Sequence, residues 1–247
     1  VEFDLLARAV SLTNSARMKA KVKRRWPLRK AYYLVSRDEK DLILENKSLL
    51  LEQTNLSDLG LEADPGKLPI IVSVKPNFEL VAPRAKARMN ELSSKLSKEN
   101  ARQLFVELSE RGKTRLHDMP DFELTQSDLV FAFVPSDPKY VVSENDDMVV
   151  VLDISRDDEL IAQGVLRDLA RNLQALRKEK GFNPTEILKT ARVSGLLSQT
   201  LALIEKKKEE LAFLVRVEKV ELNTDMNASQ SWSEAEIDGT QIKIDIV

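Results

Sequence analysis

Segments with leucines at helical spacing alternate with β-rich runs along this chain, and the alternation limits the folds that it can adopt. The clearest helical segment is 157–180, where leucines stand at 166, 169, 173 and 176 and Gly181 follows the last turn. Leucines three and four residues apart share one face of a helix, and glycine commonly ends a helix. We therefore expect long helices that bury a leucine face against sheets.

The same two periodicities divide the rest of the chain. Pro83 suits the first position of a helix and Gly112 suits the position after its end, so we expect one long helix over 83–111. The order of segments predicts an α+β fold, with an N-terminal basic helix followed by mixed sheets packed with long helices. No short-period repeat is apparent. Other helices are expected over 4–21, 38–53 and 195–212, and strands over 32–35, 68–74, 122–124, 129–134, 140–143, 148–154, 214–222 and 236–247.

Composition excludes several kinds of catalytic and metal site. The chain has 43% hydrophobic and 32% charged residues, which is typical of a globular protein, and it has no cysteine and one histidine, His117. Disulfides, thiolate metal sites and paired histidines are therefore excluded. The acidic clusters at 144–147 and 156–159 lack the alternating ligands and central glycine of a calcium loop. We expect no catalytic, cofactor-binding or metal-binding residue in this chain.

The positive charge is concentrated near the N-terminus. The segment RMKAKVKRRWPLRK, residues 17–30, has eight Lys or Arg among fourteen residues, and no acidic residue lies between Leu5 and Arg37. Cations at this density suit phosphate groups, because each contact releases counterions. Trp26 within the run offers a flat face on which an unpaired base could stack. The alternative interpretation is a solvated basic helix end with Trp26 buried in the core.

A second basic group lies on the helix expected over 157–180. Arg167, Arg171, Gln174 and Lys178 are spaced to share one helix face, and Arg177 adds a cation near the helix end. This group favours a second contact with an anionic partner. The alternative is an ordinary solvated face, since cations near a helix C-terminus are stabilised by the helix dipole.

Three segments resemble the C-terminal region of isoleucyl-tRNA synthetases, in the order and at about the spacing of that family. SARMKAKVKRRWPLR, from Ser15, resembles the end of the anticodon-binding helical bundle. RDLARNLQALRKEKGFNPTEIL, from Arg167, resembles the Arg-x-x-x-Arg-x-x-Gln-x-x-Arg-Lys helix near the family's C-terminus, and VKPNFELVAPR, from Val74, resembles a linker between the two. The absence of cysteine implies the archaeal or eukaryotic type, which lacks the zinc-binding extension of some bacterial members.

The resemblance implies a domain organisation and a parent activity. Residues 1–31 would be the end of the anticodon-binding bundle, followed by α+β subdomains over 32–155 and 156–247. The parent would be a class I synthetase that joins isoleucine to its tRNA with ATP and Mg²⁺. The HIGH-like and KMSKS-like signatures occur nowhere in the chain. We therefore expect a non-catalytic piece, opening on Val1, of a longer cytoplasmic ligase, with no cofactor of its own.

The resemblance also implies the partners and the contact residues. We expect tRNA and the missing catalytic and editing domains as partners, no membrane and a monomer. The second group of basic residues could instead be structural and pack against the bundle. The alternative function is a structural or protein-docking domain without RNA contact, which the acidic balance beyond residue 38 allows. The expected tRNA-contacting residues are Arg17, Lys19, Lys21, Lys23, Arg24, Arg25, Trp26 and Arg29, and with them Arg167, Arg171, Arg177 and Lys178.

Overall fold

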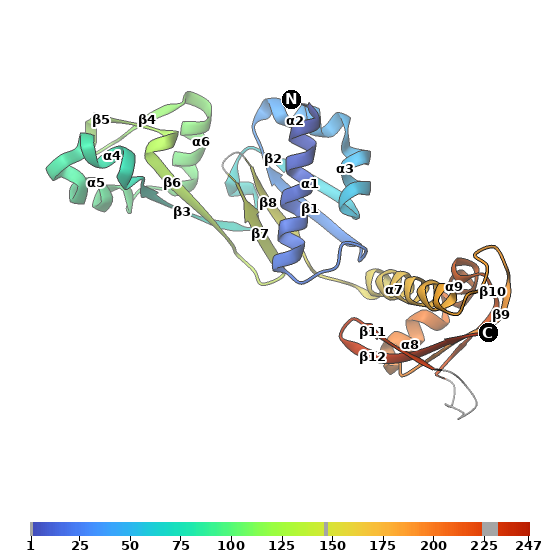
Figure 1. Cartoon of the computed structure of the whole chain (residues 1–247). Coiled ribbons are helices and arrows are strands. Elements are labelled where there is room, and N and C mark those ends of the chain that lie inside the picture. The colour runs from blue at the N-terminus through green and yellow to red at the C-terminus, as the bar shows by residue number, and fades with distance from the viewer. Residues whose placement is uncertain (1, 146–147, 224–231) are drawn as a thin grey trace. The chain divides into compact units, whose positions relative to one another are not determined.

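The computed structural model describes residues 2–145, 148–223 and 232–247 and has an α+β fold, as the sequence predicted (Figure 1). The chain forms two compact units, of which the first comprises 1–22 with 29–155 and the second comprises 23–28 with 156–247. The N-terminal part expected over 1–31 is therefore divided between the units. Residues 146–147 of the first acidic cluster lie outside the described residues.

The first unit is built on a four-stranded sheet with the strand order β2–β1–β8–β7. Helix α1 contacts β7 and β8 and buries Leu5, Ala9 and Ala16, and β1 pairs antiparallel with β8. Two short helices connect β1 to β2. The elements are α1 (Glu2–Lys19), β1 (Leu28–Leu34), α2 (Arg37–Glu45), α3 (Lys47–Thr54), β2 (Leu56–Glu62), β7 (Tyr140–Glu144) and β8 (Val149–Asp153).

A long insertion separates β2 from β7 and carries a hydrophobic cluster of its own. Val81, Leu92, Leu104 and Met119 are among the residues buried there. The antiparallel ribbon β3–β6 leads into and out of the insertion, and β4 pairs with β5. The elements are β3 (Ile70–Pro76), α4 (Phe78–Ala85), α5 (Met89–Leu96), α6 (Ala101–Arg111), β4 (Lys113–Leu116), β5 (Met119–Thr125) and β6 (Leu129–Pro135).

The single helix predicted over 83–111 is wrong, because the chain forms three helices there. Pro83 lies inside α4, and Lys86 has a φ of 47°, which ends that helix. Asn100 begins α6, since its side chain accepts hydrogen bonds from the backbone N–H groups of Arg102 and Gln103. The predicted end at Gly112 is confirmed, with a φ of 71°. The helices predicted over 38–53 and 195–212 are likewise each divided in two.

The second unit packs one long helix on a four-stranded sheet of order β10–β9–β12–β11. Asp157 accepts a hydrogen bond from the Leu160 N–H and begins α7, and Leu169 and Leu173 are fully buried on its inner face. Strand β9 pairs parallel with β10 and antiparallel with β12. The elements are α7 (Asp158–Glu179), β9 (Leu188–Ser194), α8 (Ser198–Glu205), α9 (Lys208–Val215), β10 (Val217–Leu222), β11 (Ser233–Ile237) and β12 (Thr240–Ile246).

The two units repeat one architecture that the sequence did not reveal. Each has a long helix, a strand, two short helices, a second strand and a terminal hairpin, and the orders β2–β1–β8–β7 and β10–β9–β12–β11 correspond element by element. Leu28 and Leu188 begin the first strands 160 residues apart, the same separation as Arg17 and Arg177 in the preceding helices. The first copy carries the insertion between the second and third strands of its sheet in chain order, β2 and β7.

The buried arginines show how closely the two copies agree. Arg17 donates through Nη2 to the carbonyl oxygens of Thr54 and Asn55, at 2.9 and 3.0 Å. Arg177 donates through Nη1 to those of Val215 and Arg216, at 3.0 and 3.3 Å. In each unit these carbonyls lie at the end of the second short helix, where Asn55 and Arg216 have φ values of 53° and 54°. Each arginine therefore satisfies acceptors that a helix end leaves open.

Candidate nucleic-acid interface

Segment 23–28 and helix α7 bring the two basic groups of the sequence together in the second unit. Trp26 is only 2% exposed and its ring covers Gly164 on α7. A Cβ atom at position 164 would overlap that ring, so glycine permits the close approach. The guanidinium of Arg156 lies over the same ring, 4.7 Å from the centroid. Trp26 therefore anchors the segment to the helix.

Asp168 is the electrostatic centre of this contact. It is fully buried, and it accepts hydrogen bonds from Trp26 Nε1 at 3.2 Å and from Lys23 Nζ at 3.4 Å, with a further one from Arg25 Nε. A buried carboxylate needs such partners, because an unpaired charge is costly away from water. No pattern in the sequence had indicated a role for Asp168. An acidic residue directly before a core leucine, Leu169, is the signal that could have indicated it.

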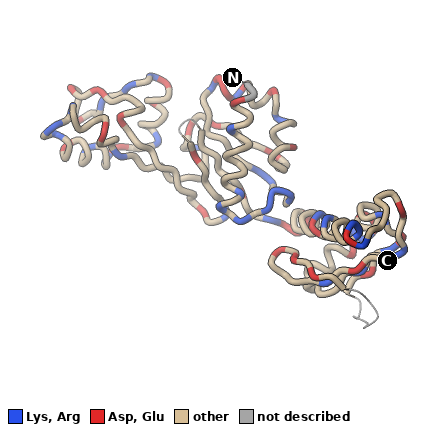
Figure 2. Tube along the Cα trace, viewed as in Figure 1, with Lys and Arg blue, Asp and Glu red and all other residues tan. Residues whose placement is uncertain are grey.

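We call the exposed cations of segment 23–28 and of the outer face of α7 the cationic track: Lys23, Arg24, Arg167, Arg171 and Lys178. Arg167 donates through Nη1 to the Arg25 carbonyl at 3.1 Å, which joins segment 23–28 to the exposed face of α7. Arg167 and Lys178 are eleven positions apart, which corresponds to about 16 Å along the helix. Lys and Arg recur along α7 in Figure 2. The shared face predicted for these α7 residues is confirmed.

Three residues that the sequence analysis expected to contact tRNA are buried. Arg17, Trp26 and Arg177 are 1%, 2% and 5% exposed. Arg177 also donates to the Asn183 and Glu186 carbonyls, so its guanidinium is occupied by main-chain acceptors. We infer that these three side chains position the surface and do not touch a ligand. For Trp26, burial in the core is the alternative that the sequence left open.

Of the four remaining expected residues, Lys19, Lys21 and Arg29 lie in the first unit and are exposed, and Arg25 is half-buried in the second unit. Lys19 donates to the Val142 carbonyl at 3.1 Å, which holds the end of α1 on the sheet. Lys21 follows the helix with a φ of 56°, and Arg29 projects from β1. The structure therefore groups the second-unit residues into one track and leaves Lys19, Lys21 and Arg29 as separate cations of the first unit.

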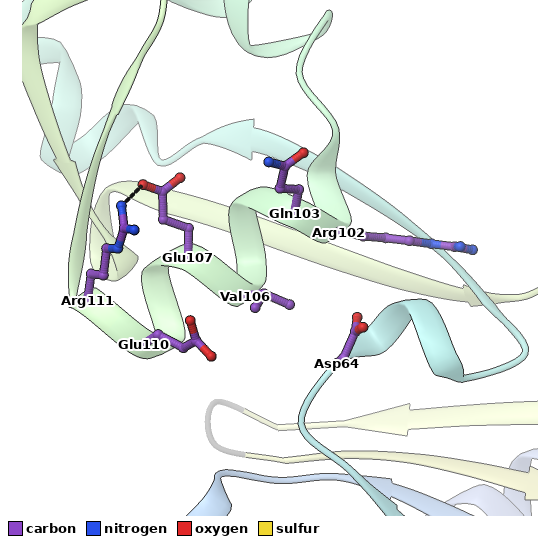
Figure 3. Close-up of a pocket in the computed structure, with 7 residues that line it drawn as sticks. All are labelled: Asp64, Arg102, Gln103, Val106, Glu107, Glu110 and Arg111. Atoms are coloured by element: carbon purple, nitrogen blue, oxygen red, sulfur yellow. Dashed lines mark hydrogen bonds and ion pairs between the residues drawn. The ribbon is translucent and has the colours of Figure 1, made fainter.

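The hollows of the first unit have mixed charge. Figure 3 shows one of about 560 Å³, in which Glu107 pairs with Arg111 at 3.0 Å and Arg102 points away from them. Asp64 and Glu110 add two more carboxylates to this lining, which contains no histidine or cysteine. Across the described ranges, no group of three or more His, Cys, Asp or Glu is placed to hold a metal ion. No helix in those ranges is long and apolar enough to cross a bilayer.

The chain is similar over most of its length to one class of aminoacyl-tRNA synthetase. The isoleucine–tRNA ligase of Methanocella arvoryzae is 27% identical over 98% of this chain and 22% of its own length. That of Pyrococcus abyssi is 26% identical over 87% of this chain and 19% of its own, and that of Pyrococcus horikoshii is 29% identical over 72% and 16%.

The similarity is confined to a small part of these relatives. The chain spans about a fifth of the length of the curated relatives that it matches, in their C-terminal part. No protein-family profile matches it. The chain is therefore similar to the C-terminal region of isoleucine–tRNA ligases.

Proposed function

We propose that this chain is the tRNA-binding region of an isoleucine–tRNA ligase and that it holds the anticodon end of the tRNA. The observation that carries the proposal is the cationic track, exposed along α7 and fixed beside it by the Trp26–Asp168 anchor. The similarity to isoleucine–tRNA ligases supports tRNA as the nucleic acid. The resemblance of residues 15–29 to the end of an anticodon-binding bundle supports the anticodon end.

The track has the chemistry that RNA phosphates require. Arg167 and Arg171 present planar guanidiniums that can bind phosphate through two parallel hydrogen bonds, and Lys178 adds a point charge. Neutralising phosphates releases bound counterions, so affinity falls steeply as salt rises. The anchor reduces the entropy lost on binding, because segment 23–28 is already held in place before RNA arrives.

In this proposal the chemistry of aminoacylation belongs to the longer parent chain. ATP and Mg²⁺ would bind there, because no HIGH-like or KMSKS-like signature occurs in these 247 residues. The partners are therefore tRNA and the parent's catalytic and editing domains. The archaeal or eukaryotic type, the cytoplasmic location and the monomeric state stay predictions.

The test is a titration of isoleucine tRNA with the chain and two triple variants at several salt concentrations. Changing Arg167, Arg171 and Lys178 together to Gln should weaken binding at least about tenfold and make the salt dependence less steep, by roughly one phosphate contact for each residue. The control changes three exposed lysines of the first unit's insertion, Lys75, Lys86 and Lys98, to Gln. Equal losses in both variants, or no binding by the unaltered chain at low salt, would refute the proposal.

Docking of another protein is the second candidate, and exposed apolar side chains favour it. On the first unit's insertion, Ile71 and Val134 face each other across β3 and β6 and are 54% and 51% exposed. Phe78 and Leu80 on α4 are 58% and 50% exposed. A pulldown in which Ile71→Lys removes a partner, while Arg24→Glu and Arg171→Glu leave tRNA binding unchanged, would favour docking over RNA contact.

A further inference from the structure

A hollow of about 450 Å³ lies where the cationic track ends. It is formed by the last turns of α7, the connection that leads to β9 and the end of α9. Its volume falls within the range of small-molecule sites. The lining residues are Gln174, Arg177, Lys178, Gly181, Phe182, Pro184, Leu214, Val215 and Arg216.

Part of the wall of this hollow is apolar, since Phe182, Pro184, Leu214 and Val215 line it. Phe182 is half-buried and Pro184 is exposed, so an aromatic ring and a proline ring are available to a ligand. Leu214 is 37% exposed and its backbone carbonyl accepts a hydrogen bond from Gln174 Nε2 at 2.9 Å, which fixes the wall contributed by α9. Gly181 has a φ of 78° and lines the hollow without adding a side chain to it. A planar group fits such walls better than a flexible chain does.

The charge of the lining is one-sided. Lys178 and Arg216 stand at the hollow, Arg177 lies beneath it, and none of the nine lining residues is acidic. Every hydrogen bond that Arg177 makes ends on a main-chain carbonyl, so within the described residues no carboxylate neutralises this buried cation. The hollow in Figure 3, by contrast, has three carboxylates in its lining. An anionic ligand is therefore favoured here.

We propose that this hollow binds a single unpaired nucleotide of an RNA strand, with its base between Phe182 and Pro184 and its phosphate toward Lys178. This inference rests on the proposed function and extends it from phosphate binding to recognition of a base. The track supports this inference, because its residues Arg171 and Lys178 lie on one face of α7 together with Gln174. That face leads to the hollow, which Gln174 and Lys178 line. A strand whose phosphates follow the track would deliver its next base to the hollow.

The experiment compares two strands of equal length, oligouridylate and an abasic ribose–phosphate strand, by fluorescence titration. Phe182→Leu retains an apolar side chain but removes the aromatic face, and Phe78→Leu on the first unit's insertion is the matched control. Phe182→Leu should weaken oligouridylate binding about tenfold, to the level of the abasic strand, because one base–aromatic stack is lost. It should leave the abasic strand unaffected. Lys178→Gln should weaken both strands, and Phe78→Leu neither.

The other outcomes separate this inference from the proposed function. If both strands bind equally well and Phe182→Leu changes nothing, the hollow holds no base and an apolar peptide segment is the better occupant, while RNA binding by the track stands. If neither strand binds at low salt, the proposed function fails with it. Uridine monophosphate provides the third arm: saturating binding that depends on Phe182, without binding of the strand, would overturn the RNA site in favour of a free nucleotide.

Discussion

The outer faces of α1 and α7 differ although the two helices occupy the same place in their units. Arg167, Arg171 and Lys178 are exposed on α7, whereas the residues 160 positions earlier, Ala7, Ser11 and Met18, are exposed and uncharged on α1. The inner faces agree, since both helices bury apolar residues at matching positions and end on a buried arginine. The shared architecture is therefore fixed by buried residues, whereas the exposed cations at positions 167, 171 and 178 of α7 have no counterpart at the matching positions of α1.

Replacing the buried arginines, which both helices share, should have the largest effect on the stability of the two units. Arg177→Met and Arg17→Met would each leave main-chain carbonyls at the end of a short helix without a donor, at a cost of about 3 kcal/mol. Hydrogen exchange should show lost protection in the second unit for Arg177→Met and in the first for Arg17→Met. Lysine at the same positions should restore only part of it, because one ammonium cannot reach all the acceptors. A variant that leaves its own unit fully protected would show that the two arginines are not equivalent.

The next effect concerns Gly164, which has no counterpart on α1, where Asp4 stands 160 positions earlier. Gly→Ala inside a helix usually stabilises it by up to about 1 kcal/mol. At position 164 the added methyl group overlaps the Trp26 ring, so Gly164→Ala should destabilise the second unit by about 1 to 3 kcal/mol. The readout is Trp26 fluorescence during urea unfolding in a chain with Trp232 changed to Phe. A gain in stability would mean that segment 23–28 does not pack on α7 in solution.

A smaller effect is expected at Asp168, where the loss of its charge and the loss of its hydrogen bonds predict opposite changes in tRNA affinity. Asp168→Asn removes a negative charge beside the track, and by charge alone tRNA should bind more tightly. If Asp168 positions Lys23 and Arg25, the variant should instead bind several-fold more weakly, an effect on the order of 1 kcal/mol. Asparagine still offers an oxygen to Trp26 Nε1, so the anchor should survive. Arg8→Gln, at the matching position on α1, is the control.

The sequence predicted the periodic parts of this fold and missed the parts fixed by single residues. The helix predicted over 157–180 is found at Asp158–Glu179, because its leucines repeat for many turns. The break at Lys86 and the cap at Asn100 depend on local backbone geometry that periodicity does not carry. The repeat is not apparent in the sequence because its copies share buried positions but few residue types, as Thr13 and Leu173 illustrate.

The candidate site likewise has features that the sequence predicted and features that it did not. Exposure of Arg167, Arg171 and Lys178 follows from helical spacing, and the sequence was sufficient to predict it. Burial of Trp26 and the role of Asp168 depend on a contact between residues 142 positions apart, which a local pattern cannot indicate. The density of charge in the sequence therefore predicted too many ligand-contacting residues, since Arg17 and Arg177 are buried.

The smallest expected effect is a dependence of stability on pH that the core of the first unit should show and that of the second should not. In the first unit the Tyr33 hydroxyl meets the Thr13 hydroxyl at 2.8 Å, whereas the matching positions of the second unit, Val193 and Leu173, are apolar. Burial raises the pKa of Tyr33 from 10.0 to about 12. Between these values the unfolded chain ionises and the folded unit does not, so stability is complete below pH 10 and falls as pH rises toward 12.

By pH about 10.5 this loss should reach somewhat under 1 kcal/mol, and it should be confined to the first unit. Lysines also titrate in this range, so the measurement is the difference between the unaltered chain and Tyr33→Phe, followed by urea unfolding with hydrogen exchange resolved by unit. Tyr33→Phe loses one hydrogen bond at neutral pH, although Thr13 still donates to the Ala9 carbonyl at 2.8 Å. The two chains should therefore converge in stability as pH rises. Parallel curves would show that the Tyr33 hydroxyl is hydrated, and the polar core would no longer distinguish the first copy from the second.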